Sequence, residues 1–290
     1  MNKKNSSETI MKWVFFVSAL FSIFAIVLIC VFIFGESLSF IKDYGLFNFV
    51  SGREWKPSNN PAQYGILPMI VGSIMVTLGA IIVGVPIGIL TAIYLSKFCP
   101  PKLYKVLRPC VDLMAGIPSI VYGFFGLVVL VPIIRKLFGG NGMSVLTASI
   151  LLGIMILPTV VSLSESALNT VVDSYYQGAI ALGASHELAV MKVVVPAAST
   201  GILSSVILGI GRAIGETMAV YMVAGNQPII LKGILTGTRT MTTNIILDMA
   251  YATGQHRDAL IATSMVLFVF ILVINLAFNY VSRRAANEQQ

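Results

Sequence analysis

The sequence predicts an all-α membrane protein with six transmembrane helices. Of its 290 residues, 57% are hydrophobic and only 11% are charged, and the mean hydropathy is +0.89. A soluble domain has about a quarter of its residues charged, so a lipid bilayer is the solvent that fits this composition. A spanning helix needs about 20 mostly apolar residues, and six segments of the chain meet that requirement.

The first half of the chain contains four of the expected spans. Residues 13–34 carry no charge and follow a basic start, as in a signal peptide, but the apolar stretch is too long and no small-residue cleavage site follows. We therefore expect a cytoplasmic amino terminus at 1–12 and a retained first span. The remaining elements of this half are an external loop at 35–64 and spans at 65–95, 113–134 and 143–164.

The second half begins with a cytoplasmic coupling loop, expected at 165–196. A fifth span at 197–225 follows, and it is the one expected span that contains charged residues. The last elements are an external loop at 226–258, a sixth span at 259–281 and a cytoplasmic tail at 282–290. The permease domain as a whole is expected over 65–281.

The two external loops differ in composition from flexible linkers. The first contains Trp55, Pro57 and Pro61, which indicates an ordered loop. The second contains several apolar residues, including Ile245 and Leu247, so we expect it to dip back toward the protein.

Basic residues set the predicted orientation. Lys97, Lys102, Lys105 and Arg108 cluster between the second and third spans, and such clusters favour the cytoplasmic side. An even number of spans then places both termini in the cytoplasm, although Arg135 and Lys136 in a short outer loop go against the rule. The chain contains no P-loop sequence, so any ATP hydrolysis belongs to another chain.

Glycine pairs within the spans favour close helix packing. Gly84 and Gly88, and likewise Gly211 and Gly215, have the spacing at which small residues let two helix backbones approach. Prolines such as Pro86 and Pro158 each remove a backbone hydrogen bond and permit a kink.

Arg212 and Glu216 are the charged residues inside the fifth span, and we expect them to mark the translocation pathway. Each costs roughly 2.5–3.5 kcal/mol at the centre of a membrane and therefore needs a partner or water. Their i, i+4 spacing places them on one face of a continuous helix, where they can pair. Either the two form a salt bridge that fixes two helices, or Arg212 lines a route for an anion, because a guanidinium can bind a tetrahedral oxyanion bidentately.

The coupling loop is expected to fold into two short helices. Ser174 and Gln177 have the spacing of a capping box, which predicts a helix start. Gly183 then interrupts this helix, and Ser185 can cap a second one. A compact, partly apolar pair of helices needs a groove on another chain or burial under its own bundle.

This loop resembles the EAA loop of ABC-importer permeases. The matching residues are Gln177, Gly178 and Ala179, then Gly183 after three residues, and Pro196 at the family's distance from Gly183. Gln177 and Gly178 depart from the family's Glu and Ala. The resemblance implies a type I (MetI-like) importer fold and insertion of the short helix into a cleft on the ATPase.

Three further stretches are similar to the C-type permease of phosphate-specific transporters (PstC type). They begin at Ala115 (AGIPSIVYGFFGL), Gly209 (GIGRAIGETMAV) and His256 (HRDAL). The resemblance implies phosphate as cargo, with Arg212 and Glu216 in its transport. It also implies an A-type (PstA-type) permease partner, two copies of an ATP-binding subunit, an external phosphate-binding protein and a bacterial plasma membrane location.

Other functions remain open at this stage. Sulfate and molybdate permeases also carry tetrahedral oxyanions, and a secondary transporter could use Glu216 as a proton site, although no matching charge exists in the first half. A non-transporting membrane anchor would leave both charges without a role. No covalent chemistry, cofactor or nucleic-acid partner is expected. No metal site is expected either, because Cys30, Cys99 and Cys110 lack metal-ligand spacing.

Overall fold

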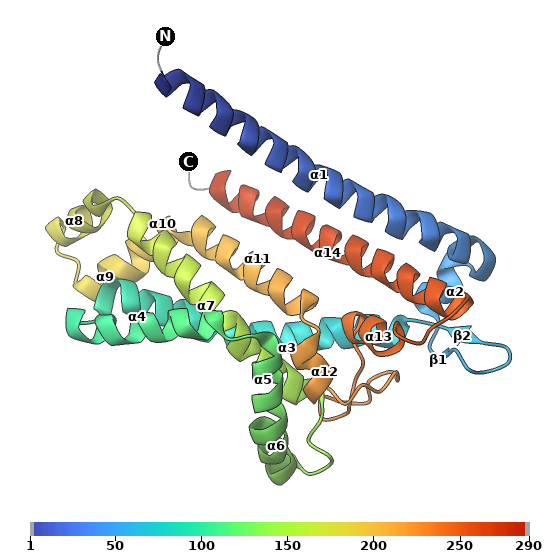
Figure 1. Cartoon of the computed structure of the whole chain (residues 1–290). Helices are drawn as coiled ribbons and strands as arrows, with labels where there is room; N and C mark the ends of the chain where they lie inside the picture. The colour runs from blue at the N-terminus through green and yellow to red at the C-terminus, as the bar shows by residue number, and fades with distance from the viewer. Residues whose placement is uncertain (1–2, 288–290) are drawn as a thin grey trace.

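The computed structural model describes residues 3–287 and shows helices with one small β-hairpin (Figure 1). The elements are α1 (Lys3–Tyr44), α2 (Leu46–Ser51), β1 (Trp55–Lys56), β2 (Gln63–Tyr64), α3 (Leu67–Ile93), η1 (Tyr94–Phe98), α4 (Pro101–Gly116), α5 (Ser119–Phe125), η2 (Gly126–Leu130), α6 (Val131–Phe138), α7 (Val145–Thr170), α8 (Asp173–Ala181), α9 (His186–Ala189), η3 (Val190–Val194), α10 (Val195–Ala197), α11 (Ser199–Gly215), α12 (Met218–Val223), α13 (Met241–Asp248) and α14 (Gln255–Asn287). The three η segments are π-helices.

Five helical stretches of the described residues are long and apolar enough to cross a membrane. A sixth span is present if the stretch His186–Ala197 and α11, which are bent by 66° relative to each other, are taken as one broken span. The start of α1, the end of α14 and the helices α8 and α9 lie at the same end of the molecule (Figure 1). Residues 1–2 and 288–290 of the expected cytoplasmic ends lie outside the described residues.

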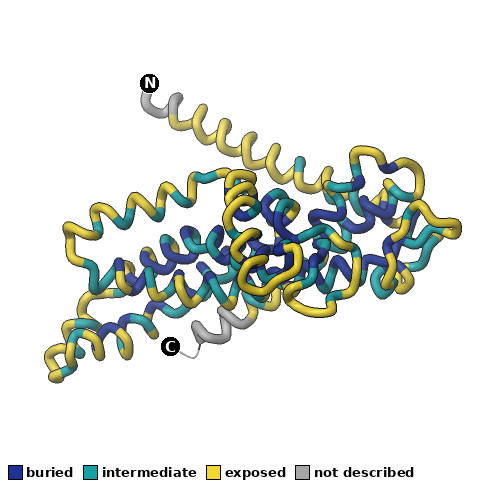
Figure 2. Tube along the Cα trace, turned by 90° about the horizontal axis from the view of Figure 1, so that it is seen from below, coloured by how far each residue is buried: buried dark blue, intermediate teal, exposed yellow. Residues whose placement is uncertain are grey.

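The first helix is longer than the apolar segment at 13–34. It continues to Tyr44, so the expected external loop at 35–64 begins inside a helix. No proline interrupts this stretch, and the helix ends before Gly45, whose φ of +89° favours glycine. α1 lies along α14, with Phe34 and Phe268 in edge-to-face contact at 6.0 Å, while most of its surface is exposed (Figures 1 and 2).

α3 and α7 form the central helix pair. A Cβ at Gly84 would lie 2.6 Å from the carbonyl oxygen of Gly153, and a Cβ at Gly88 would lie 2.8 Å from Cγ1 of Val160. The two glycines therefore allow the backbones to approach, as their spacing predicts. The main buried cluster surrounds this contact and includes Leu151.

The third span is shifted relative to the expected 113–134. α4 forms a separate amphipathic helix before it, and the chain breaks at Ile117 because Pro118 disfavours a helical residue before it. The apolar stretch that could cross the membrane is Ser119–Phe138.

The two segments expected as external loops fold against the ends of the long helices. Phe40, Trp55 and Tyr64 form a buried aromatic cluster with residues of α2, α3, α13 and α14. The helix α13 has buried residues on the inner side, including Met241 and Asn244. The expected order of the first loop is therefore confirmed, and the second loop packs against the protein through α13, whereas its residues Ile229 and Ile230 are exposed.

Candidate functional site

Arg212 lies half-buried in the last turn of α11, next to α7. Its Nη1 donates a hydrogen bond of 3.2 Å to the hydroxyl Oγ1 of Thr159. The two helices approach closely at Gly209, where an added Cβ would lie 3.1 Å from Cγ2 of Val160. A guanidinium has several N–H donors, and Thr159 is the one hydrogen-bond partner of Arg212 among the described residues. The bond orients the group and leaves other donors for a ligand.

Glu216 lies outside α11, so the prediction of one continuous helix over 197–225 is wrong. Its backbone is extended, with φ −70° and ψ 129°, and α12 starts two residues later. The described residues contain no ion pair between Arg212 and Glu216. The two charges therefore flank a break in the span instead of sharing one helix face.

The break is stabilised by replacement hydrogen bonds. Oε1 of Glu216 accepts from the backbone N–H of Ala219 at 3.2 Å, and the hydroxyl of Thr242 in α13 donates to the carbonyl of Glu216 at 3.1 Å. The N–H of Ala219 and the carbonyl of Glu216 both lie at helix ends, where they would otherwise be unpaired. Side chains that bond the local backbone in this way compete with helix formation. The flanking Gly215 and Thr217 also have low helix propensity.

One face of α11 is open. A Cβ at Gly211 or at Gly215 would have no atom of the described chain within 4 Å. This small-residue pair therefore packs against nothing in the described residues, in contrast to Gly84 and Gly88.

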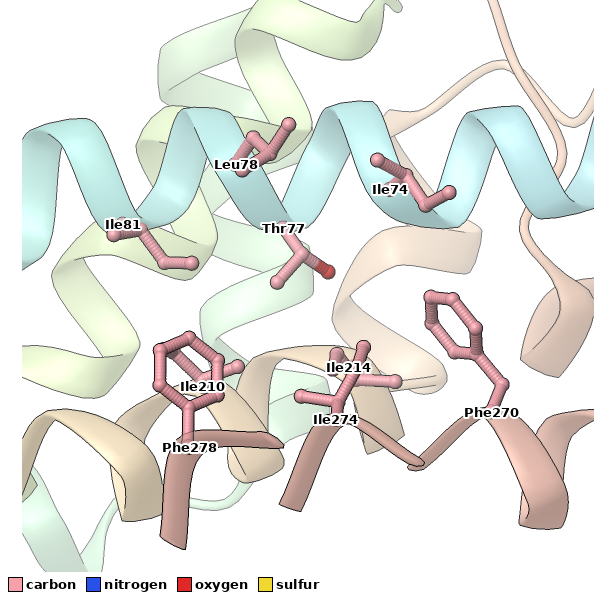
Figure 3. A pocket seen from close by; sticks show the side chains of 9 residues that line it. All are labelled: Ile74, Thr77, Leu78, Ile81, Ile210, Ile214, Phe270, Ile274 and Phe278. Carbon is pink, nitrogen blue, oxygen red and sulfur yellow. The ribbon is translucent and has the colours of Figure 1, made fainter. Parts of the chain in front are cut away.

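The groove on another side of α11 is apolar (Figure 3). Residues of α3, α11 and α14 enclose about 110 Å³ there, and Thr77 has the single polar side chain among them. The lining residues are Ile74, Thr77, Leu78, Ile81, Ile210, Ile214, Phe270, Ile274 and Phe278. An anion would lose its hydration in this groove without gaining partners, so the groove is unsuitable as a phosphate route.

The helices α8 and α9 with the turn between them, residues 173–189, form a projecting unit that we call the knob (Figure 1). α8 starts at Asp173 without a side-chain cap, so the predicted capping box of Ser174 and Gln177 is wrong: Ser174 already lies within the helix. Gly183 has φ +88° and separates the two helices. The predicted cap at Ser185 is confirmed, since its Oγ accepts from the N–H of Leu188 at 3.3 Å.

The knob exposes apolar side chains. Leu182 is 91% exposed, and Tyr175, Ile180, Leu188 and the neighbouring Met191 are exposed as well. Of the residues matching the EAA pattern, Gln177, Gly178, Gly183 and Pro196 are exposed and Ala179 is half-buried. Pro196 lies apart from the knob, in α10. This surface is suited to contact with another protein.

A buried ion pair between α4 and α7 was missed by sequence reasoning. Arg108 pairs with Glu165, whose side chain is 3% exposed, and the hydroxyl of Tyr104 donates to Glu165 at 2.8 Å. This bond to the carboxylate raises the pKa of Tyr104 above its ordinary value. The sequence predicts Glu165 as the first residue of the coupling loop, because the apolar run ends at Ser164. In the structure α7 continues to Thr170, so Glu165 lies in this helix. The i, i+4 spacing of Tyr104 and Arg108 was the available signal.

A second polar cluster surrounds Asp248 at the end of α13. Its carboxylate accepts from Nε1 of Trp55 at 3.1 Å and from the hydroxyl of Tyr251 at 3.0 Å. Arg239 and His256 each approach Oδ2 of Asp248 to 3.4 Å. The described residues contain no group of three or more His, Cys, Asp and Glu side chains suited to a metal ion. Through Trp55, Asp248 and His256, the cluster connects β1 to α13 and α14.

Comparison with known proteins adds a family match. Residues 84–287 match the model of the family described as binding-protein-dependent transport system inner membrane component. A probable ABC transporter permease protein, YqgH of Bacillus subtilis, is 38% identical over 239 residues, which cover 81% of this chain and 77% of YqgH. The phosphate transport system permease protein PstC of Mesorhizobium japonicum is 32% identical, with coverage of 87% and 83%. A probable PstC of Methanocaldococcus jannaschii is also 32% identical, with coverage of 92% and 91%.

Solved structures support the fold. A bacterial alginate ABC transporter in complex with its periplasmic protein contains a chain with a TM-score of 0.65 at 15% identity, with 96% of both chains covered. The MetNI methionine ABC transporter in an inward-facing conformation gives a TM-score of 0.61 at 18% identity, with 76% of this chain and 95% of that chain covered. The fold is therefore that of a MetI-like importer permease.

Proposed function

Because the chain belongs to the family of binding-protein-dependent transport system inner membrane components, we propose that it is the C-type permease subunit of an ATP-driven phosphate importer. In this role it forms half of the translocation pathway and performs no covalent chemistry itself. Its relatives over most of the chain include phosphate permeases from bacteria and an archaeon, which supports phosphate over other oxyanions.

The observation that carries the proposal is the position of Arg212. The guanidinium is held by Thr159 at the end of α11, directly before the break at Glu216. A half-buried guanidinium with free donors binds a tetrahedral oxyanion more strongly than one in bulk water, since the effective dielectric constant is lower. Glu216 places a carboxylate near the site, which limits how tightly an anion is retained. A pathway site must release its ion as well as bind it.

The knob is the proposed contact with the ATPase. It exposes Leu182 and a set of further apolar side chains at the end of the molecule where both described chain ends lie (Figure 1). The basic residues Lys97, Lys102 and Lys105 lie near the same end, on η1 and α4, and favour the cytoplasmic side. We therefore assign both termini and the knob to the cytoplasm.

The complete transporter then contains several chains. The expected partners are an A-type permease, two copies of an ATP-binding subunit and an external phosphate-binding protein, all assembled at a bacterial plasma membrane. The open face of α11 with Gly211 and Gly215 is available to the second permease. The opposite end, with α13 and the β-hairpin, is available to the binding protein (Figure 1).

Replacement of Arg212 tests the proposed pathway. In the reconstituted complex, Arg212→Gln should abolish phosphate uptake while ATPase association is retained, because the variant removes the charge and keeps polar bonding to Thr159 possible. Lys232→Gln serves as the matched control, since it removes an exposed cation from the outer loop. Normal phosphate uptake by Arg212→Gln would refute the role of Arg212, and sulfate or molybdate uptake in place of phosphate uptake by the unaltered complex would change the assigned cargo.

Replacement of Gly183 tests the docking role of the knob. Gly183→Pro cannot adopt the observed φ of +88°, because proline is restricted to about −65°. The variant should therefore lose co-purification with the ATPase. Gly178→Ala is the control, since this glycine is helical and a Cβ there meets no atom within 4 Å. Equal co-purification of both variants would argue against the docking role.

A further inference from the structure

His186 joins the knob to the end of the second span. The residue opens α9, and its Nε2 lies 3.0 Å from the backbone carbonyl oxygen of Lys97 in η1. Its Nδ1 lies 2.8 Å from the hydroxyl of Tyr176 in α8. The ring also makes an edge-to-face contact with Phe98 at 4.8 Å between centroids. One imidazole thus contacts both knob helices and the extension of α3.

The hydrogen-bond pattern fixes where the proton lies. A carbonyl oxygen can only accept, so Nε2 must carry a proton and donate it to Lys97. In the neutral ring Nδ1 then accepts from the hydroxyl of Tyr176. Lys97 lies in the last turn of η1, where backbone carbonyls lack partners within the helix. His186 therefore caps the end of the α3–η1 helix with a side chain from the knob.

The capped helix leads toward Arg212. The hydroxyl of Ser96 donates to Oδ1 of Asn169 at 2.6 Å, and the glycine contacts described above join α3 to α7 along their length. α7 in turn contributes Thr159, the partner of Arg212. The covalent route from the knob reaches Arg212 separately, through η3, α10 and α11. The knob is thus connected to the site by one covalent route and one packed route, and His186 is the polar link of the second.

We propose that His186 is a positioning residue that makes the knob and α3 move as one body when the ATPase displaces the knob. The proposal rests on the proposed function, because it assigns the ATPase contact to the knob. A displacement of the knob then moves α7, which contacts Arg212, through α3. It also moves α11, which carries Arg212, through η3. Without the link, the knob is held to α3 by apolar packing alone, such as that of Tyr176 against the cluster that contains Ala92 and Ile93, and ATP hydrolysis becomes less tightly coupled to transport.

Two substitutions separate this role from simple folding of the loop. His186→Gln keeps an N–H donor near the position of Nε2 and retains the bond to Lys97. His186→Asn keeps an acceptor near the position of Nδ1, for Tyr176, but its shorter side chain does not reach Lys97. We expect His186→Asn to lower transport-coupled uptake by about three- to tenfold, as expected for one lost hydrogen bond, and His186→Gln to restore most of it. Association with the ATPase and basal ATP hydrolysis should be unchanged in both.

A distance measurement tests the mechanical claim without transport. Spin labels would be placed at Asp173, an exposed polar residue at the start of α8, and at the exposed Ile82 on α3, after replacement of Cys30, Cys99 and Cys110 by serine. In the complex with His186 intact, the distance distribution should stay narrow with and without ATP. In His186→Asn it should broaden or shift on ATP binding.

Equal distance distributions in the intact and His186→Asn complexes, or equal uptake by His186→Asn and His186→Gln, would overturn the proposal. A failure of the proposed function would look different. In that case the unaltered complex would itself show no phosphate uptake, and the distance experiment would still report whether the link exists.

Discussion

Arg108 and Glu165 should differ sharply in the cost of their removal, although they form one ion pair. The side chain of Glu165 is 3% exposed. In Arg108→Met its carboxylate keeps the hydroxyl of Tyr104 as its remaining partner. Breaking a buried pair in this way costs about 3–5 kcal/mol, because an uncompensated charge stays buried. We therefore expect Arg108→Met to fall at the upper part of this range of destabilisation.

Glu165→Gln should cost much less. Arg108 keeps its second partner, with its Nη2 3.1 Å from Oδ1 of Asp112, and its side chain is 27% exposed and can be hydrated. Glutamine also retains an acceptor for Tyr104. The loss is then close to that of one hydrogen bond to a charged group, about 1.5–3 kcal/mol.

The assay is the free energy of unfolding of the permease in bicelles, for both single variants and for Arg108→Met combined with Glu165→Leu. The double variant should recover stability relative to Arg108→Met, because an apolar pair can replace a buried ion pair at little cost. Equal losses in the two single variants, with no recovery in the double variant, would refute the reasoning.

Two further predictions concern helix packing and pH. Gly84→Ala should destabilise the permease by about 1–3 kcal/mol in the same unfolding assay, because its Cβ would lie 2.6 Å from the carbonyl oxygen of Gly153. Gly211→Ala should not destabilise it, because a Cβ there has no atom within 4 Å. Similar losses in the two variants would contradict the packing argument. The bond from Tyr104 to Glu165 should stabilise the fold below the ordinary pKa of tyrosine and be lost as the pH rises through the raised pKa of the folded state. An unfolding titration should show a smaller alkaline loss in Tyr104→Phe than in the unaltered chain, since other tyrosines with raised pKa values, such as Tyr64 and Tyr251, remain in both. An identical loss in both chains would argue against it.

Much of the architecture could be predicted from local composition. The existence of the spans α3 and α7 follows from apolar length, the close packing of α3 follows from Gly84 and Gly88, and the two-helix knob follows from Gly183 and from the cap at Ser185. These features depend on residues near in sequence, so single positions identify them. The capping box at Ser174 failed because Val172 and Asp173 begin the helix earlier, without a side-chain cap.

Contacts between distant residues were not predictable in the same way. Glu165 looked like the first residue of a loop, because its partner Arg108 lies on a helix 57 residues away. Asp248 likewise gains its partner Trp55 across 193 residues. A charge at the end of an apolar run can extend a helix or end it, and the outcome depends on whether the fold brings a counter-charge to it.

The break at Glu216 shows how this limit affects function. An i, i+4 pair of opposite charges favours helix continuity by about 0.2–0.5 kcal/mol. Against this small gain, the side chain of Glu216 accepts from the N–H of Ala219, and the backbone carbonyl of Glu216 accepts from the hydroxyl of Thr242, 26 residues away in α13. Two such bonds outweigh the pair. The guanidinium of Arg212 consequently makes no ion pair with Glu216 in the described residues, and under the proposed function its remaining donors are available to an anion.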